Sequence, residues 1–386
     1  MVVLSVSVCA TATSPVGALP GAPSADGGRR PITVVDLGGW GSGINQLGLS
    51  ERGHVVVNEQ VPPDGSTPSR FRDIQWYRGR TVEIAAEPGR QLDPSGMNDR
   101  GVVVGSDRPV DGGPVRGFVW DGEMIPQPEE PTEWWAEAID ERGRILVNRR
   151  EDTGSRASVR SHDREITSPD LPGGGWMSGR AMNDRGQVLG SASGIDDPRT
   201  LVWRPGTQPV VIDVPDGSRW FPSQINDRGS VLLSGSSPGG SQVVLWKHGR
   251  AVDLGTLGGS ATSLLTLPFL QPDHLNDRDE VTGSSLTASG QYHAFLWSNG
   301  RMRDLGTLGG ASSYGYGIND RGEVVGQSQT ATGAWSAFLW RDGVMIDIGA
   351  LASPTRSAAH AINDRGQVLG QRDDFYGVLW ETRGRG

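Results

Sequence analysis

The sequence has a single cysteine, no long apolar run beyond its start and no excess of positive charge. Because Cys9 stands alone, no disulfide can form within the chain. After the first segment, no apolar stretch reaches the roughly 20 residues that a membrane-spanning helix needs. The net charge of −9 argues against docking on a nucleic-acid backbone or an anionic membrane. We therefore expect no nucleic-acid partner and no transmembrane segment.

The usual signatures of catalysis are missing as well. The sequence has no Gly-x-Ser-x-Gly elbow, no phosphate loop and no dense acidic calcium loop. Asp196-Asp197 and Glu129-Glu130 have the character of solvated loop charges. We expect no metal, no cofactor and no catalytic residue, although a glycosidase site assembled from distant loop carboxylates stays an alternative. None of the histidines shows metal-ligand spacing to another: His54, His162, His248, His274, His293 and His360.

The N-terminal segment is apolar and then rich in small residues and proline. This pattern predicts a signal peptide over residues 1–25, with small-residue cleavage options near Ala18 or Ala25, and a linker over residues 26–31. No basic residues precede the apolar run, and a disordered tail is the alternative. The segment predicts an extracellular or cell-envelope location, and we expect a monomer.

With 57 Gly and 25 Pro, the chain is rich in turn residues, and one turn recurs about every 43 residues. Its best copies read Asn-Asp-Arg-Gly, as at Asn319 to Gly322, and weaker copies begin at Ser50, Asp140 and Asn276. The Asn can cap the turn and the Gly takes the positive φ of a type I turn with a bulge, a position that Asp279 fills in the sixth copy. Each copy therefore closes a hairpin. The turn glycines are Gly101, Gly186, Gly229, Gly322 and Gly366.

Each repeat also carries an apolar run that ends in tryptophan, as in Phe-Leu-Trp or Val-Leu-Trp. Such runs lack clean alternation, which is typical of strands buried on both faces. The first copy ends at Trp76, and the third repeat has Val159-Arg160-Ser161 instead. The other repeat tryptophans are Trp120, Trp203, Trp246, Trp297, Trp340 and Trp380.

Four short strands per repeat, packed on both faces, are typical of a propeller blade. A strand-like segment at Ile32–Gly39 precedes the first repeat, whereas no fourth strand follows Trp380. We therefore predict an all-β fold, an eight-bladed β-propeller of four-stranded blades over residues 32–382, closed by its N-terminal strand. Seven blades are the alternative, if the first or third repeat fails to form one.

Several repeats resemble a known family. Asp-Leu-Gly-Thr-Leu-Gly-Gly occurs at Asp253–Gly259 and Asp304–Gly310, and His-Ala-Phe-Leu-Trp occurs at His293–Trp297. Together with Ile-Asn-Asp-Arg-Gly, these segments resemble the HAF repeat of bacterial proteins labelled probable extracellular repeats. The resemblance implies export and a repeat architecture over about Ile32 to Trp380. It implies no activity and no catalytic residue.

The remaining tryptophans fall outside the repeat pattern, in segments that the propeller topology places on one face. They can fill gaps between blades, or they can offer a ligand stacking surfaces. On the second interpretation, a saccharide or a peptide binds on this variable loop face. The candidate ligand-binding residues are Trp134, Trp135, Trp176, Trp220, Trp40, Trp335 and Tyr314, and Tyr316 lies beside them.

These patterns leave three functions open. The first is a secreted binding or scaffold propeller for a saccharide or peptide. The second is a propeller hydrolase or lyase that acts on a polysaccharide, and the third is a cell-envelope structural protein. The missing motifs favour a protein that is not an enzyme, and the sequence leaves this open. A carboxylate pair beneath the loop aromatics would favour the second function.

Overall fold

The computed structural model describes most of the chain from Ile32 to Thr382. The predicted signal peptide (1–25), the linker (26–31), Cys9 and Trp40 lie outside the described residues. The described ranges are 32–39, 44–61, 70–127, 132–152, 154–162, 164–171, 175–193, 199–214, 220–237, 240–264, 273–353, 355–373 and 376–382.

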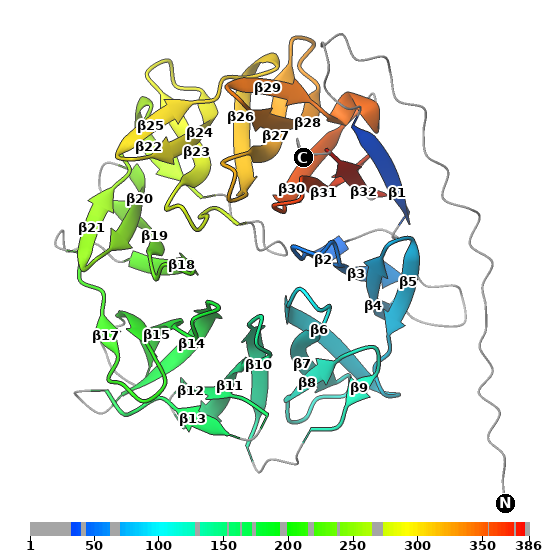
Figure 1. The fold of residues 1–386 in the computed structure, drawn as a ribbon, viewed down its shortest axis with the longest axis vertical. Coiled ribbons are helices and arrows are strands. Elements are labelled where there is room, and N and C mark those ends of the chain that lie inside the picture. Colours follow the sequence, from blue (N-terminus) through cyan, green and yellow to red (C-terminus); the bar gives the residue numbers. More distant parts are fainter. Residues whose placement is uncertain are drawn as a thin grey trace, which may run out of the picture.

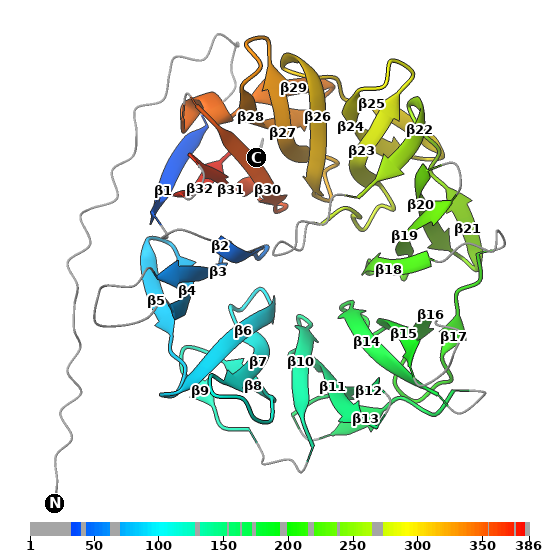
Figure 2. The ribbon, with the colours of Figure 1, turned by 180° about the vertical axis from the view of Figure 1, so that it is seen from behind.

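Eight antiparallel sheets of four strands form a ring (Figure 1), and the same ring is seen from behind in Figure 2. The innermost strand of each sheet comes first in its repeat. Blades one to four comprise β2 (Ile44–Leu49), β3 (Val55–Val61), β4 (Arg70–Tyr77), β5 (Arg80–Ile84); β6 (Arg90–Met97), β7 (Val103–Pro109), β8 (Arg116–Trp120), β9 (Met124–Ile125); β10 (Trp134–Ile139), β11 (Ile145–Glu151), β12 (Gly154–Arg160), β13 (Glu165–Thr167); and β14 (Trp176–Met182), β15 (Val188–Ser193), β16 (Thr200–Trp203), β17 (Val210–Val211).

Blades five to eight follow the same order, with one short 3-10 helix before the last blade. They comprise β18 (Trp220–Ile225), β19 (Val231–Ser237), β20 (Gly240–Lys247), β21 (Arg250–Asp253); β22 (Gly258–Ser263), β23 (Val281–Thr287), β24 (Tyr292–Ser298), β25 (Arg301–Asp304); β26 (Gly309–Ile318), β27 (Val324–Thr330), β28 (Trp335–Arg341), β29 (Val344–Asp347); and η1 (Gly349–Leu351), β30 (Ser357–Ile362), β31 (Gln367–Arg372), β32 (Tyr376–Glu381).

The N-terminal strand β1 (Thr33–Gly39) completes the last blade, whose strand order is β30-β31-β32-β1. It pairs with β32 in antiparallel register, with Val34 opposite Trp380. The prediction of eight blades closed by the first strand is confirmed, and the seven-bladed alternative is wrong. The third repeat forms a full blade although Arg160 stands where other blades have tryptophan, because β12 pairs with β11 and β13 and buries Ala157 and Val159 in an apolar cluster.

The third strands of the blades pack between neighbours on both faces. In β16 every residue is buried, and in β28 the five central residues are buried. Trp203, Trp297 and Trp380 are among the largest fully buried side chains, whereas Trp246 is half-buried. Core clusters join residues of adjacent blades, as when Leu232 and Phe295 share one cluster. The core is therefore a circular series of contacts between sheets.

A glycine in the second strand of most blades allows the first strand to bulge toward it. In β26 the register shifts between Gly315 and Gly317. A Cβ on Gly326 of β27 would lie 1.9 Å from the carbonyl oxygen of Tyr314. Equivalent close contacts to a backbone oxygen occur at Gly105, Gly190 and Gly370. The glycine is needed for this close backbone approach.

Candidate functional site

The repeated turn closes the hairpin between the first two strands of a blade. In the seventh blade, the side-chain oxygen of Asn319 accepts the backbone N–H groups of Arg321 at 3.1 Å and Glu323 at 3.0 Å. The backbone N–H of Gly322 donates to the Asn319 carbonyl oxygen at 3.0 Å, and Gly322 has a φ of 76°. Asp279 takes the same place in the sixth blade with a φ of 63°. These bonds fix the turn that the sequence indicates.

The same turns also connect each blade to the next. The Asn319 side-chain amide donates to the backbone carbonyl of Asn363, one blade further on, at 3.1 Å. Because this amide is buried, each such bond satisfies a group that would otherwise be costly to bury. Asn side chains make this bond to the following blade from positions 98, 183, 226, 276 and 363.

Carboxylates at the second turn position form a closed ring around the propeller axis. The backbone N–H of Asp320 donates to Asp364 of the next blade at 2.8 Å, and the N–H of Asp364 donates to Glu51 of the first blade at 2.7 Å. In the first blade the N–H of Arg52 donates to Asp99 at 3.2 Å. The remaining members follow in the same way, so the ring is Glu51, Asp99, Glu141, Asp184, Asp227, Asp277, Asp320 and Asp364.

Proximity and partial burial raise the pKa values of several ring carboxylates. Burial, and then repulsion from Asp364 and Asp99, raises the pKa of Glu51 to about 7, against a lowering by the backbone N–H of Asp364. Burial also raises the pKa values of Asp184 and Asp277, with repulsion from neighbouring ring carboxylates adding to it. The ring side chains are half-buried or exposed, so solvent and solutes reach them.

The turn arginines differ in their partners from blade to blade. In blades six and seven, Arg278 pairs with Glu280 and Arg321 pairs with Glu323, each at 2.7 Å. In blade eight the corresponding position is Gln367, which supplies no charge to Arg365. The Gln367 amide oxygen instead accepts a hydrogen bond from the Asn363 side chain at 2.9 Å.

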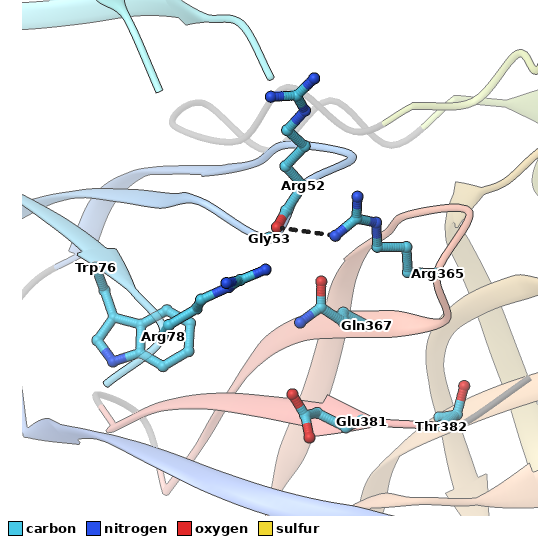
Figure 3. A pocket seen from close by; sticks show the side chains of 8 residues that line it. All are labelled: Arg52, Gly53, Trp76, Arg78, Arg365, Gln367, Glu381 and Thr382. Carbon is cyan, nitrogen blue, oxygen red and sulfur yellow. Dashed lines mark hydrogen bonds between the residues drawn. The ribbon is translucent and has the colours of Figure 1, made fainter. Parts of the chain in front are cut away.

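Next to this turn, a pocket of about 300 Å³ lies at the seam between blades eight and one (Figure 3). The guanidinium groups of Arg78 and Arg365 point toward one another above Gln367, whereas Arg52 points away (Figure 3). Trp76 and Glu381 lie lower in the same view. The lining residues are Arg52, Gly53, Trp76, Arg78, Arg365, Gln367, Glu381 and Thr382.

The histidines do not form a catalytic or metal site in the part of the chain that the structure describes. The nearest approach to a dyad is His293, whose Nδ1 lies 2.9 Å from the Asp304 carboxylate within one blade. His360 is buried, its ring nitrogens have no hydrogen-bond partner among the described residues, and burial lowers its pKa to about 4. No group of three or more His, Cys, Asp or Glu among the described residues could hold a metal ion.

The predicted loop-face aromatics lie in different surroundings. Trp134 is only 2% exposed, with the Arg160 guanidinium 4.4 Å from its ring centroid and Gly117 against its edge, so its ring offers no face to a ligand. This position is corrected to a packing role. Trp135 is half-buried and donates to Glu137 at 3.0 Å.

The other aromatics on this face are partly accessible, except Tyr316. Trp176 is half-buried with Arg156 over its ring at 5.4 Å, and Trp220 packs at the edge of a core cluster. Tyr314 lies 5.5 Å from Trp335, and Tyr316 is buried against His360. A ligand-binding role for the accessible members stays a prediction.

The contacts between turns were not predicted. The Asn-Asp-Arg-Gly turn was assigned to hairpin closure alone, although Asn and Asp recur at positions where a turn tolerates several residue types. The recurrence of asparagine and aspartate at these two positions was the signal of a further role for their side chains. Their partners, one repeat away, became visible only in the folded ring.

Comparison with known proteins identifies the fold. No family model matches the chain, and no curated protein matches it. The β-propeller domain of the Trilobed protease from Pyrococcus furiosus matches with a TM-score of 0.47 and 13% identity, over 79% of this chain and 96% of that one. A Mycobacterium tuberculosis puromycin-hydrolyzing peptidase matches with 0.49 and 12%, over 85% and 57%. A prolyl endopeptidase matches with 0.52 and 14%, over 80% and 49%.

The chain therefore spans about half the length of the latter two peptidases. At these identities, the likeness shows the β-propeller fold. Nowhere in the described part of the chain is there a helix with the length and apolar character that a membrane crossing needs.

The comparisons correct the predicted function. The sequence suggested a secreted binding or scaffold propeller, with a polysaccharide hydrolase or an envelope structural protein as alternatives. The prolyl endopeptidase that matches the fold is instead a peptidase, a different kind of protein. The prediction failed because it inferred function from surface aromatics and a family label, while one propeller scaffold serves many functions.

Proposed function

We propose that this chain is a non-catalytic propeller module of a peptidase system, and that its carboxylate ring receives positively charged groups of a peptide. The closed ring of eight carboxylates carries this proposal. One oxygen of each ring carboxylate accepts a hydrogen bond from a backbone N–H of the preceding blade. The second oxygen stays available to accept from an ammonium or guanidinium group.

The raised pKa values support a concentration of negative charge at the ring. Carboxylates on neighbouring turns repel one another. At Asp184, burial is the main cause of the raised pKa, and repulsion from Asp227 raises it further. A bound cation removes this repulsion, so it binds more favourably than it would to an isolated carboxylate. A peptide N-terminus, a lysine or an arginine supplies such a cation.

The fold comparison supports the peptidase connection. A prolyl endopeptidase shares the fold, and this chain spans 49% of its length. No metal-binding group of His, Cys, Asp or Glu occurs among the described residues. In this proposal the carboxylate ring handles the peptide, and peptide-bond hydrolysis takes place outside the described propeller.

An extracellular or cell-envelope location and membership of the HAF-repeat family remain part of the proposal. Residues 1–25 and the repeat motifs support them. A monomer is the proposed state of the propeller.

A binding titration with a lysine-containing peptide tests the function. The full chain should bind a Gly-Lys-Lys-Gly peptide, and the combined Asp184→Asn, Asp227→Asn and Asp277→Asn variant should lose about tenfold or more in affinity, since each lost ion-pair hydrogen bond contributes roughly 1.5–3 kcal/mol. The asparagine oxygen still accepts the backbone N–H, so the ring stays closed. Affinity should rise from pH 5 to pH 8, because Glu51, with a pKa of about 7, then becomes charged.

A variant with Asp111→Asn, Asp121→Asn and Asp213→Asn is the matched control, because it removes the same charge at exposed positions away from the ring. It should bind like the wild type. Equal losses in both triple variants, or unchanged binding in the ring variant, would contradict the ring's role. If mass spectrometry detects cleavage of the peptide by the chain alone, the proposal of a non-catalytic module is contradicted.

A further inference from the structure

The pocket at the seam between blades eight and one has an unusual balance of charge. Arg52 and Arg365 come from the repeated turns of blades one and eight, and Arg78 comes from the turn between β4 and β5. Within the described residues, none of the three guanidinium groups has a carboxylate at ion-pair distance, whereas their counterparts Arg278 and Arg321 are paired. Glu381 is the one acidic residue in the lining.

The repeat makes the origin of this charge clear. Where blades six and seven place Glu280 and Glu323 beside the turn arginine, blade eight places the neutral Gln367. Where blades six and seven place Asn299 and Asp342 in the outer turn, blade one places Arg78. At this seam, Gln367 therefore removes a negative charge and Arg78 adds a positive one.

Arg78 is held in place by a stack of side chains. Its guanidinium carbon lies 5.1 Å from the centroid of the Tyr77 ring. The Tyr77 ring in turn stacks on His54, with centroids 3.8 Å apart and planes 1° from parallel. Burial lowers the pKa of His54, and the positive charges of Arg52 and Arg78 lower it further, against Asp99. A neutral His54 suits a stack beneath a cation, and the stack reduces the entropy that Arg78 would lose on binding a ligand.

We propose that this seam pocket binds a small oxyanion ligand, a carboxylate or a phosphate, between Arg78 and Arg365. Two guanidinium groups that converge on one point offer several N–H donors to the oxygens of such a group. The Gln367 amide lies between them and below, where it can donate a further hydrogen bond (Figure 3). The volume of about 300 Å³ is at the lower end for small-molecule sites, which excludes a bulky ligand.

Glu381 adds a test of direction to this proposal. Its carboxylate lies in the same pocket as the arginines, so it repels an anion bound there. Neutralising Glu381 should therefore strengthen anion binding, while neutralising either arginine should weaken it. A nonspecific attraction to surface charge would not depend on these particular positions.

Isothermal titration calorimetry of the full chain with inorganic phosphate and, separately, with succinate tests the site. Arg78→Ala and Arg365→Ala should each lower the affinity for the bound anion about tenfold or more, in line with a charge-assisted hydrogen bond. Glu381→Gln should raise it severalfold. Arg78 and Arg365 are exposed, so both variants should keep the wild-type melting temperature without ligand. Binding of phosphate alone identifies a phosphate ligand, and binding of succinate alone identifies a carboxylate ligand.

Arg185→Ala is the matched control. Arg185 is exposed at the same turn position of blade four and is likewise followed by a glutamine two residues on, and the outer turn of the next blade has His248 where blade one has Arg78. It should leave affinity unchanged. The proposal is overturned if neither anion binds, if Arg78→Ala and Arg365→Ala bind like the wild type, or if Arg185→Ala loses as much affinity as they do. The site binds anions and the carboxylate ring binds cations, so the two proposals fail independently.

Discussion

Replacing Trp380 by alanine should destabilise the propeller by about 3–5 kcal/mol, the usual range for loss of a large buried aromatic side chain. Trp380 is fully buried in β32 and packs in one cluster with Val34 of β1 and Leu339 of blade seven. The substitution leaves a cavity where the first strand, the last blade and its neighbour meet. Chemical denaturation followed by circular dichroism measures the change.

Trp335→Ala is the control for this prediction. Trp335 is half-buried at the start of β28 and contacts Tyr314, so its loss exposes less new apolar surface. We expect a smaller shift of the denaturation midpoint than for Trp380→Ala. Equal midpoints for Trp380→Ala and the wild type would mean that the third strands are not the packed centres of the blades.

Replacing Gly326 by alanine should also be costly, at about 3 kcal/mol, because a single methyl group has no space there. The added Cβ would stand 1.9 Å from the Tyr314 carbonyl oxygen and 2.9 Å from the Phe338 ring. Backbone atoms cannot move aside as a flexible side chain can, so β26 and β27 would have to separate. Thermal and chemical denaturation of the variant measure the loss.

Gly333→Ala separates the effect of crowding from that of backbone conformation. Nothing lies within 4 Å of a Cβ on Gly333, but its φ of 85° disfavours a side chain by about 1 kcal/mol. Gly326→Ala should therefore lower stability clearly more than Gly333→Ala. The opposite order would mean that the bulge in β26 is not tightly packed against β27.

Much of the fold was predictable because each repeat carries local sequence signals for its turns and strands. The Asn-Asp-Arg-Gly turn and the run ending in tryptophan mark the first hairpin and the third strand, and their recurrence gives the number of blades. The segment before the first repeat and the missing strand after Trp380 predicted the closure of the ring. The third blade formed without its tryptophan because a buried Val159 still supplies apolar surface.

The candidate sites were less predictable because they depend on contacts between repeats. Glu51 and Asp364 are 313 residues apart in the sequence, yet they are neighbours in the ring. Arg78 and Arg365 likewise belong to opposite ends of the chain and meet only at the seam. The burial of Trp134 depends on Gly117 in the preceding blade, which leaves room for the ring. None of these partners can be read from a single repeat.

Closure of the ring by β1 underlies both the carboxylate ring and the seam pocket, because both join the last blade to the first. A disulfide between β1 and β32 tests it directly. Thr33 and Glu381 are opposite one another in the antiparallel pair, 348 residues apart in sequence. Directly opposed residues in such a pair have Cα atoms about 4.5–5.5 Å apart, which suits a disulfide.

The measurement uses Thr33→Cys with Glu381→Cys in a Cys9→Ser background, oxidised and run on a non-reducing denaturing gel. The control places the second cysteine at Ser298, the corresponding position of blade six. We expect the Thr33–Glu381 pair to form an intramolecular cross-link that changes the mobility of the chain, and the Thr33–Ser298 pair to form none. Absence of the first cross-link, or equal cross-linking of both pairs, would contradict a propeller closed by its first strand.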